Sequence, residues 1–76
     1  MDSFKINYKK LKGLLTEKEK TYKECSEAIG ISETQFGKKI NGEVDFWITE
    51  VAKLAKFLNL TENEFFAVFV PGLYKE

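Results

Sequence analysis

Apolar residues recur every three or four positions along most of this 76-residue chain, and this spacing is typical of amphipathic helices. Five segments fit the helical pattern, at residues 8–18, 22–29, 33–40, 48–58 and 61–70. The one strand candidate, residues 44–48, is short and flanked by charged residues. The pattern therefore predicts an all-α fold with five helices, formed by a single domain over residues 1–76.

Helix start and stop signals agree with this placement. Asn7, Thr21, Ser32 and Thr61 are suitable N-cap residues, and an acidic residue three positions after Thr21 and Thr61 completes two capping boxes. The stop signals are Gly30, Asn41-Gly42, Asn59 and Pro71-Gly72.

The helical spacing also predicts the core and the exceptions to it. Cys25 falls on the inward side of its helix, so we expect a buried, unreactive thiol. Trp47 is either a plug between helices or an exposed anchor for a partner, and we favour the plug. Neighbouring phenylalanines near the C-terminus point about 100° apart on a helix, so they cannot all face inward. The candidate dimer surface is therefore Phe66, Phe69, Leu73 and Tyr74.

Composition narrows the class of protein. The chain has no run of about 18 apolar residues, so no membrane span is expected. The N-terminus lacks the apolar segment of a secretion signal, and a lone cysteine suits a reducing compartment, so we expect a cytoplasmic protein. There is no histidine, metal-ligand spacing, phosphate-binding loop or nucleophile beside a base, so we expect no enzymatic activity and no cofactor or metal.

The net charge is zero, whereas a nucleic-acid binder is usually basic. The charges are nevertheless uneven: residues 1–42 contain nine lysines against six acidic residues, and residues 43–76 contain three lysines against six acidic residues. Every basic residue is lysine, so the commonest reader of guanine, arginine, is absent. Tight DNA readout by a single monomer is therefore not expected.

The stretch from residue 21 to 42, TYKECSEAIGISETQFGKKING, contains a short capped helix, a glycine-centred turn and a second short helix. The second helix has few apolar residues, so most of its side chains remain outside the core. This is the layout of a helix-turn-helix, whose second helix is built to enter the major groove of DNA.

The same stretch resembles the helix-turn-helix of Cro/C1-type (XRE-like) phage repressors. The residues that carry the resemblance are Thr21, Glu24, Ser26, Ile29, Gly30-Ile31-Ser32, Phe36 and Asn41-Gly42. Three flanking segments, NYKKLKGLLTEKEKT, NGEVDFWITEV and AKFLNLTENEFFAVF, look similar to phage and prophage Cro-like proteins. The resemblance implies a lambda-repressor-like domain that regulates transcription in a bacterial cell and binds operator DNA as a homodimer, with half-sites about 34 Å apart.

The resemblance also places the contacts with DNA. The base-reading positions fall on Glu33, Thr34, Gln35 and Lys38. Glutamate can accept from cytosine, threonine can meet thymine and lysine can donate to guanine, while glutamine is a further candidate for contact with adenine or a phosphate. The phosphate-contacting positions fall on Tyr22, Lys23, Ser32, Lys39, Asn41 and Gly42.

The chain departs from the family at several of these places. Gly37 lies inside the second helix of the motif, and Trp47 stands where a small capping residue is usual. Glu43 and Asp45 stand where related proteins often carry basic residues. An alternative prediction is therefore a module of the same fold that binds a phage repressor protein and modulates it without gripping DNA.

Overall fold

The computed structural model describes residues 6–71, and all of the regular structure in this part of the chain is helical. The helices are α1 (Tyr8–Glu17), α2 (Tyr22–Ile29), α3 (Glu33–Ile40), α4 (Ile48–Leu58) and α5 (Glu62–Phe69). The expected all-α, five-helix fold is confirmed, with helix ends within about one residue of the predicted places.

The expected caps position these helices. The Asn7 side chain accepts a hydrogen bond from the Lys10 N–H at 3.0 Å, and Ser32 accepts one from the Gln35 N–H at 3.0 Å. Both predicted capping boxes are present, with Thr21 paired to Glu24 and Thr61 paired to Glu64. Each box satisfies backbone N–H groups that have no partner inside the helix, which is why such short helices can start at defined residues.

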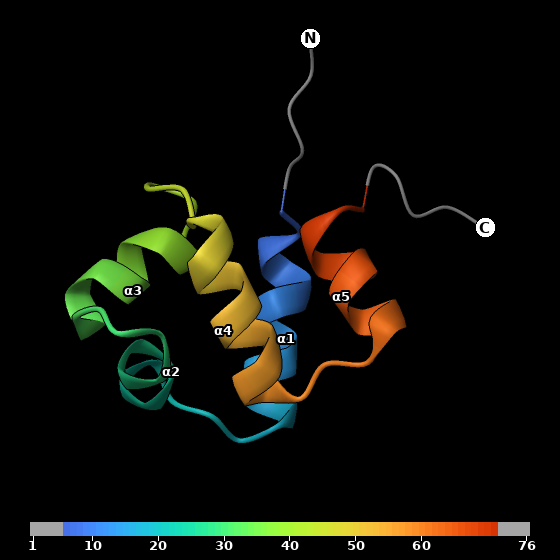
Figure 1. Ribbon diagram of the computed structural model, residues 1–76, viewed down its shortest axis with the longest axis horizontal. Coiled ribbons are helices and arrows are strands. Elements are labelled where there is room, and N and C mark those ends of the chain that lie inside the picture. The colour runs from blue at the N-terminus through green and yellow to red at the C-terminus, as the bar shows by residue number, and fades with distance from the viewer. Residues whose placement is uncertain (1–5, 72–76) are drawn as a thin grey trace, which may run out of the picture.

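The helices surround one hydrophobic core. Figure 1 shows α4 in the middle of the molecule, with α2 and α3 on one side and α5 on the other. Helix α2 packs against both α3 and α4, while α1 packs against α5 and α3. The core consists of Leu11, Leu14, Leu15, Cys25, Ile29, Phe36, Ile40, Val51, Leu54, Leu58, Val68 and Phe69.

The start of α1 and the end of α5 are joined directly. The Asn7 N–H donates to the Val68 carbonyl at 2.7 Å, and Ile6 packs against the core. Phe4, which was expected to pack beside Ile6, lies outside the described residues. The fold thus leaves α2 and α3 together on the side of the molecule opposite α5 (Figure 1).

Candidate nucleic-acid interface

A tight turn fixes the angle between α2 and α3. Gly30 adopts a left-handed conformation with φ of 83°, which most side chains would disfavour. The N–H groups of Gly30 and Ile31 both donate to the Ser26 carbonyl, at 2.8 Å and 3.0 Å. Ser32 then caps α3. The turn is closed by hydrogen bonds at both ends, so α3 is held in a defined orientation on α2.

Aromatic contacts hold the inward side of α3. Phe36 and Ile40 have no exposed surface. The Phe36 ring meets Tyr22 edge-on at 5.4 Å between centroids and meets Phe46 edge-on at 6.1 Å. Because Phe36 and Ile40 are four residues apart, they lie on one side of the helix, and that side faces the core.

The opposite side of α3 is open to solvent. The four residues predicted to read bases, Glu33, Thr34, Gln35 and Lys38, are all exposed. Thr34 and Lys38 are four residues apart and lie roughly opposite Phe36 and Ile40, at about 100° per residue around the helix. Thr34 and Lys38 therefore share the outer side of α3, whereas Glu33 and Gln35 are exposed about 100° to either side of Thr34 in the first turn of the helix.

The predicted phosphate contacts are placed less uniformly. Lys23, Ser32 and Asn41 are exposed. Tyr22 is half-buried, with its ring packed against Phe36. Gly42 is exposed, but it has φ of 82°, and a Cβ atom there would lie 3.2 Å from the Tyr8 ring. The packing of its ring is sufficient to explain why a tyrosine occupies position 22, and the backbone conformation is sufficient to explain why a glycine occupies position 42.

The predicted phosphate contact of Lys39 does not fit the structure. Lys39 is only 5% exposed. Its Nζ lies 2.6 Å from Glu50 Oε1 and 5.4 Å from the centre of the Trp47 ring. Lys39 lies on the flank of α3 that faces α4, so its ammonium is committed inside the protein. The prediction came from the resemblance to phage repressors, and a match by position does not reveal the Glu50 carboxylate that holds this ammonium inside the fold.

Sequence reasoning missed the partner, Glu50. Its Oε1 accepts hydrogen bonds from Lys39 at 2.6 Å and from the Trp47 N–H at 2.9 Å. Burial alone would raise the pKa of the Glu50 carboxyl, but these two hydrogen bonds, together with the positive charges of Lys39 and Lys53, outweigh it and hold the pKa below its ordinary value. The available signal was a glutamate three positions after the residue that precedes a helix, the place of a capping carboxylate.

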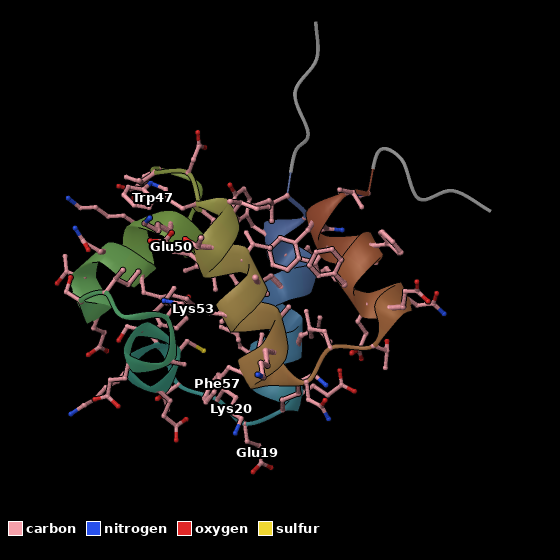
Figure 2. All side chains as sticks on the ribbon, viewed as in Figure 1. Glu19, Lys20, Trp47, Glu50, Lys53 and Phe57 are labelled. Carbon is pink, nitrogen blue, oxygen red and sulfur yellow. The ribbon has the colours of Figure 1, made fainter. Side chains whose placement is uncertain are left out.

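Trp47 is not an interhelical plug. It is 68% exposed, and Figure 2 shows it at the outer end of the molecule, beyond Glu50 and near the end of α3. The core stripe of α4 begins only at Val51. Trp47 precedes the helix as its N-cap residue, so its side chain lies outside that stripe.

The candidate dimer surface on α5 also needs correction. Phe69 is 6% exposed and belongs to the core, because it lies beside fully buried Val68 where α5 meets α1. Phe66 is half-buried and meets Phe65 edge-on at 5.9 Å. Leu73 and Tyr74 lie outside the described residues. Cys25, in contrast, is fully buried as expected.

Taken together, the fold and the site define a small all-α domain in which a tightly connected helix pair presents a polar helix face. The family model described as "Protein of unknown function (DUF739)" matches residues 4–71, so the chain belongs to this family. No curated protein matches the chain. None of the helices within residues 6–71 has the length and hydropathy that a membrane span requires.

Proposed function

We propose that this protein is a sequence-specific DNA-binding transcriptional regulator of the Cro/C1-like type, and that α3 enters the major groove. The observation that carries the proposal is the exposed polar side of α3, held outward by the buried Phe36 and Ile40 and by the closed turn at Gly30. An α-helix fits the width of the major groove, and a helix with a free polar side can meet base edges there.

Each exposed residue of α3 has a chemical role in this proposal. Lys38 donates to the guanine O6 and N7 acceptors, and Thr34 meets a thymine methyl or a base acceptor. Glu33 accepts from cytosine N4, and Gln35 pairs with adenine. Lys23 on α2 and Ser32 and Asn41 at the two ends of α3 are exposed, and in this proposal they contact backbone phosphates and set the orientation.

Electrostatics make the second copy of the chain important. The buried ion pair of Lys39 with Glu50 leaves Lys38 as the one exposed lysine of α3. A single domain with few phosphate contacts binds DNA weakly and with a shallow salt dependence. The proposed regulator therefore acts as a homodimer on a pseudo-palindromic operator, as the resemblance to phage repressors implies, and is found with the nucleoid when bound.

The first test is a titration of labelled random-sequence duplex with the protein, in which fluorescence anisotropy measures binding. It is carried out at about 50 mM salt, where lysine–phosphate contacts are strong, and at about 200 mM salt, where they are weak. We expect binding that weakens with salt. Selection of bound sequences from a random duplex pool then identifies the operator. The proposal fails if no duplex binds at roughly tens of micromolar protein at the lower salt, within the usual range of non-specific affinity.

A pair of lysine variants then tests the role of α3. Lys38→Ala should change which selected sequences are preferred, because a base contact is lost. Lys23→Ala should weaken binding to all sequences alike, because a phosphate contact is lost. Lys9→Ala, an exposed lysine on α1, is the control for loss of one charge. Identical behaviour of all three variants would contradict the placement of α3 in the groove.

The second candidate function is a protein-binding modulator of a phage repressor. Zero net charge and the absence of arginine favour it, and the burial of Lys39 removes one more cation from the DNA-facing helix. The same duplex titration separates the two functions, because a modulator of this kind leaves duplex unbound at both salt concentrations.

A further inference from the structure

All of the large exposed hydrophobic residues in the described part of the chain lie within five consecutive positions. They are Val44, Trp47 and Ile48, with exposed fractions of 43%, 68% and 80%. Single exposed apolar residues are ordinary on a protein surface, but a group gathered around one tryptophan marks an interaction site. We refer to these three residues as the loop patch, because they lie in the connection from α3 to α4 and its first helical residue.

The loop patch is held rigidly. The Trp47 N–H donates to Glu50 at 2.9 Å, and the Lys39 ammonium, itself bound to Glu50, lies 5.4 Å from the centre of the Trp47 ring. At the other end of the loop, the Glu43 N–H donates to the Lys38 carbonyl at 2.8 Å. A partner would therefore meet a pre-arranged tryptophan, and little conformational entropy would be lost on binding.

The charges around the loop patch restrict what can bind there. Glu43 and Asp45 are exposed on either side of Val44. The ion pairs found among the described residues are Lys18–Glu64 and Lys39–Glu50, so neither loop carboxylate is neutralised within residues 6–71. Residues 41–49 contain no cation, and the nearest exposed lysines in sequence are Lys38 and Lys53 on the adjoining helices.

Two occupants fit these charges poorly. Phosphates of DNA would be repelled by two carboxylates next to the apolar residues. A two-fold interface would place the loop patch of one copy against that of another, and it would bring Glu43 and Asp45 of both copies together. A protein segment with apolar side chains flanked by lysine or arginine avoids both problems.

We propose that the loop patch is a docking surface for such a basic, apolar segment of another protein. Trp47 and Ile48 bury the apolar side chains of the segment, and Glu43 and Asp45 meet its cations. This surface is distinct from the outer side of α3. Trp47 contacts α3 through Lys39, which lies on the flank of the helix that faces α4. The loop patch therefore adds a protein partner to the proposed DNA-binding function and does not depend on it.

The test is a selection from a displayed library of random peptides, followed by anisotropy titrations with the labelled synthetic peptides that are enriched. We expect enriched peptides that combine apolar residues with lysine or arginine. Trp47→Ala/Ile48→Thr should weaken their binding at least tenfold. Glu43→Gln/Asp45→Asn should weaken it severalfold at low salt, whereas Glu17→Gln/Glu27→Gln, which removes two exposed carboxylates elsewhere, should leave it unchanged.

Other outcomes overturn the proposal. Enrichment of only neutral or acidic peptides, or binding that survives Trp47→Ala/Ile48→Thr, removes the assigned partner. Self-association in sedimentation that this variant abolishes assigns the surface to a second copy instead. Duplex binding that the same variant abolishes assigns the surface to DNA. All variants alter exposed residues, and circular dichroism with thermal melting checks that each is folded.

The two functions are tested separately. If duplex fails to bind the wild-type protein but the peptides bind through the loop patch, the DNA-binding proposal fails and the docking surface stands. If duplex binds and no peptide binds through the patch, the reverse holds. Trp47 is the single tryptophan of the chain, so a blue shift of its emission on peptide addition reports directly from the surface.

Discussion

The buried ion pair between α3 and α4 leads to a prediction about stability. Lys39→Met keeps most of the side-chain volume but leaves the Glu50 carboxylate buried without its cation. Removing one partner of a buried pair usually costs about 3–5 kcal/mol. The two side chains retain exposures of 7% and 9%, so water relieves part of the penalty. We expect Lys39→Met to destabilise the protein by about 2–3 kcal/mol, out of a total of roughly 4–11 kcal/mol for this length.

Removing the charge of the other partner, Glu50, should cost less stability. Glu50→Gln retains an acceptor for the Trp47 N–H, and the long stem of Lys39 can turn its ammonium toward water. We expect Glu50→Gln to cost about 1–2 kcal/mol. Adding Lys39→Met should cost little more, because the double variant has no buried charge left unpaired at this place. Lys38→Met is the matched control, since it alters the neighbouring exposed lysine and should change stability by less than about 0.5 kcal/mol.

The effect of Lys39→Met should depend on pH. The folded-state pKa of Glu50 is lowered from its ordinary value of 4.5, so the pair contributes stability above about that pH and loses it as pH falls through the folded-state pKa. Below this range Glu50 is protonated and its lost cation matters less. The stabilities of wild type and Lys39→Met should therefore converge at acidic pH.

Urea unfolding followed by circular dichroism, from about pH 3 to pH 7, measures the four proteins of the double-mutant cycle and the Lys38→Met control. A double-mutant cycle gives the coupling free energy between the two side chains, which we expect to be about 2 kcal/mol at pH 7. Additive losses, or a gap between wild type and Lys39→Met that stays constant across this range, would refute a buried ion pair at this place.

Three further predictions concern the core and the glycines. Phe36→Ala should cost about 3–5 kcal/mol and lower the melting temperature by at least about 12 °C, because Phe36 is fully buried. A melting temperature close to that of wild type would place this ring outside the core. Gly13→Ala should stabilise α1 by about 0.5–1 kcal/mol, because no neighbouring atom lies within 4 Å of the new Cβ. Gly42→Ala should destabilise the protein by about 1–2 kcal/mol, because its φ is 82° and the new Cβ would lie 3.2 Å from the Tyr8 ring. The melting temperature of Gly13→Ala should lie above that of wild type and the melting temperature of Gly42→Ala below it, and the opposite order would contradict this reasoning. Burial, with a smaller contribution from Glu24, raises the pKa of the Cys25 thiol to about 11, so a disulfide reagent at pH 8 should react slowly with folded protein and rapidly in urea, and rapid native labelling would contradict the burial.

The fold could be predicted from the sequence because local signals and the apolar pattern agreed. The side chains of Thr21, Ser32 and Thr61 cap the helices that they were expected to cap, and Gly30 ends α2 in the left-handed conformation expected of a glycine stop. These features depend on a few neighbouring residues, so a sequence window contains all of the information that they require.

The details that failed depend on contacts between distant segments. Lys39 was assigned to a phosphate by the resemblance to phage repressors, yet Glu50, eleven positions further along, supplies a counter-charge inside the fold. Trp47 was expected between helices, but its place before α4 puts it outside the helix stripe. For Phe69, the register of α5 against α1 decided which aromatic side chain faces inward.

The outer residues of α3 have a consequence for how this domain can be altered. Thr34 and Lys38 are exposed, and the helix that carries them is secured by Phe36, Ile40 and the ion pair of Lys39. The residues that stabilise α3 and the residues of its proposed recognition surface thus reside on different sides of the same eight residues. A library that randomises only the outer positions should yield folded proteins almost throughout, so new binding preferences can be sought on this scaffold without redesigning its interior.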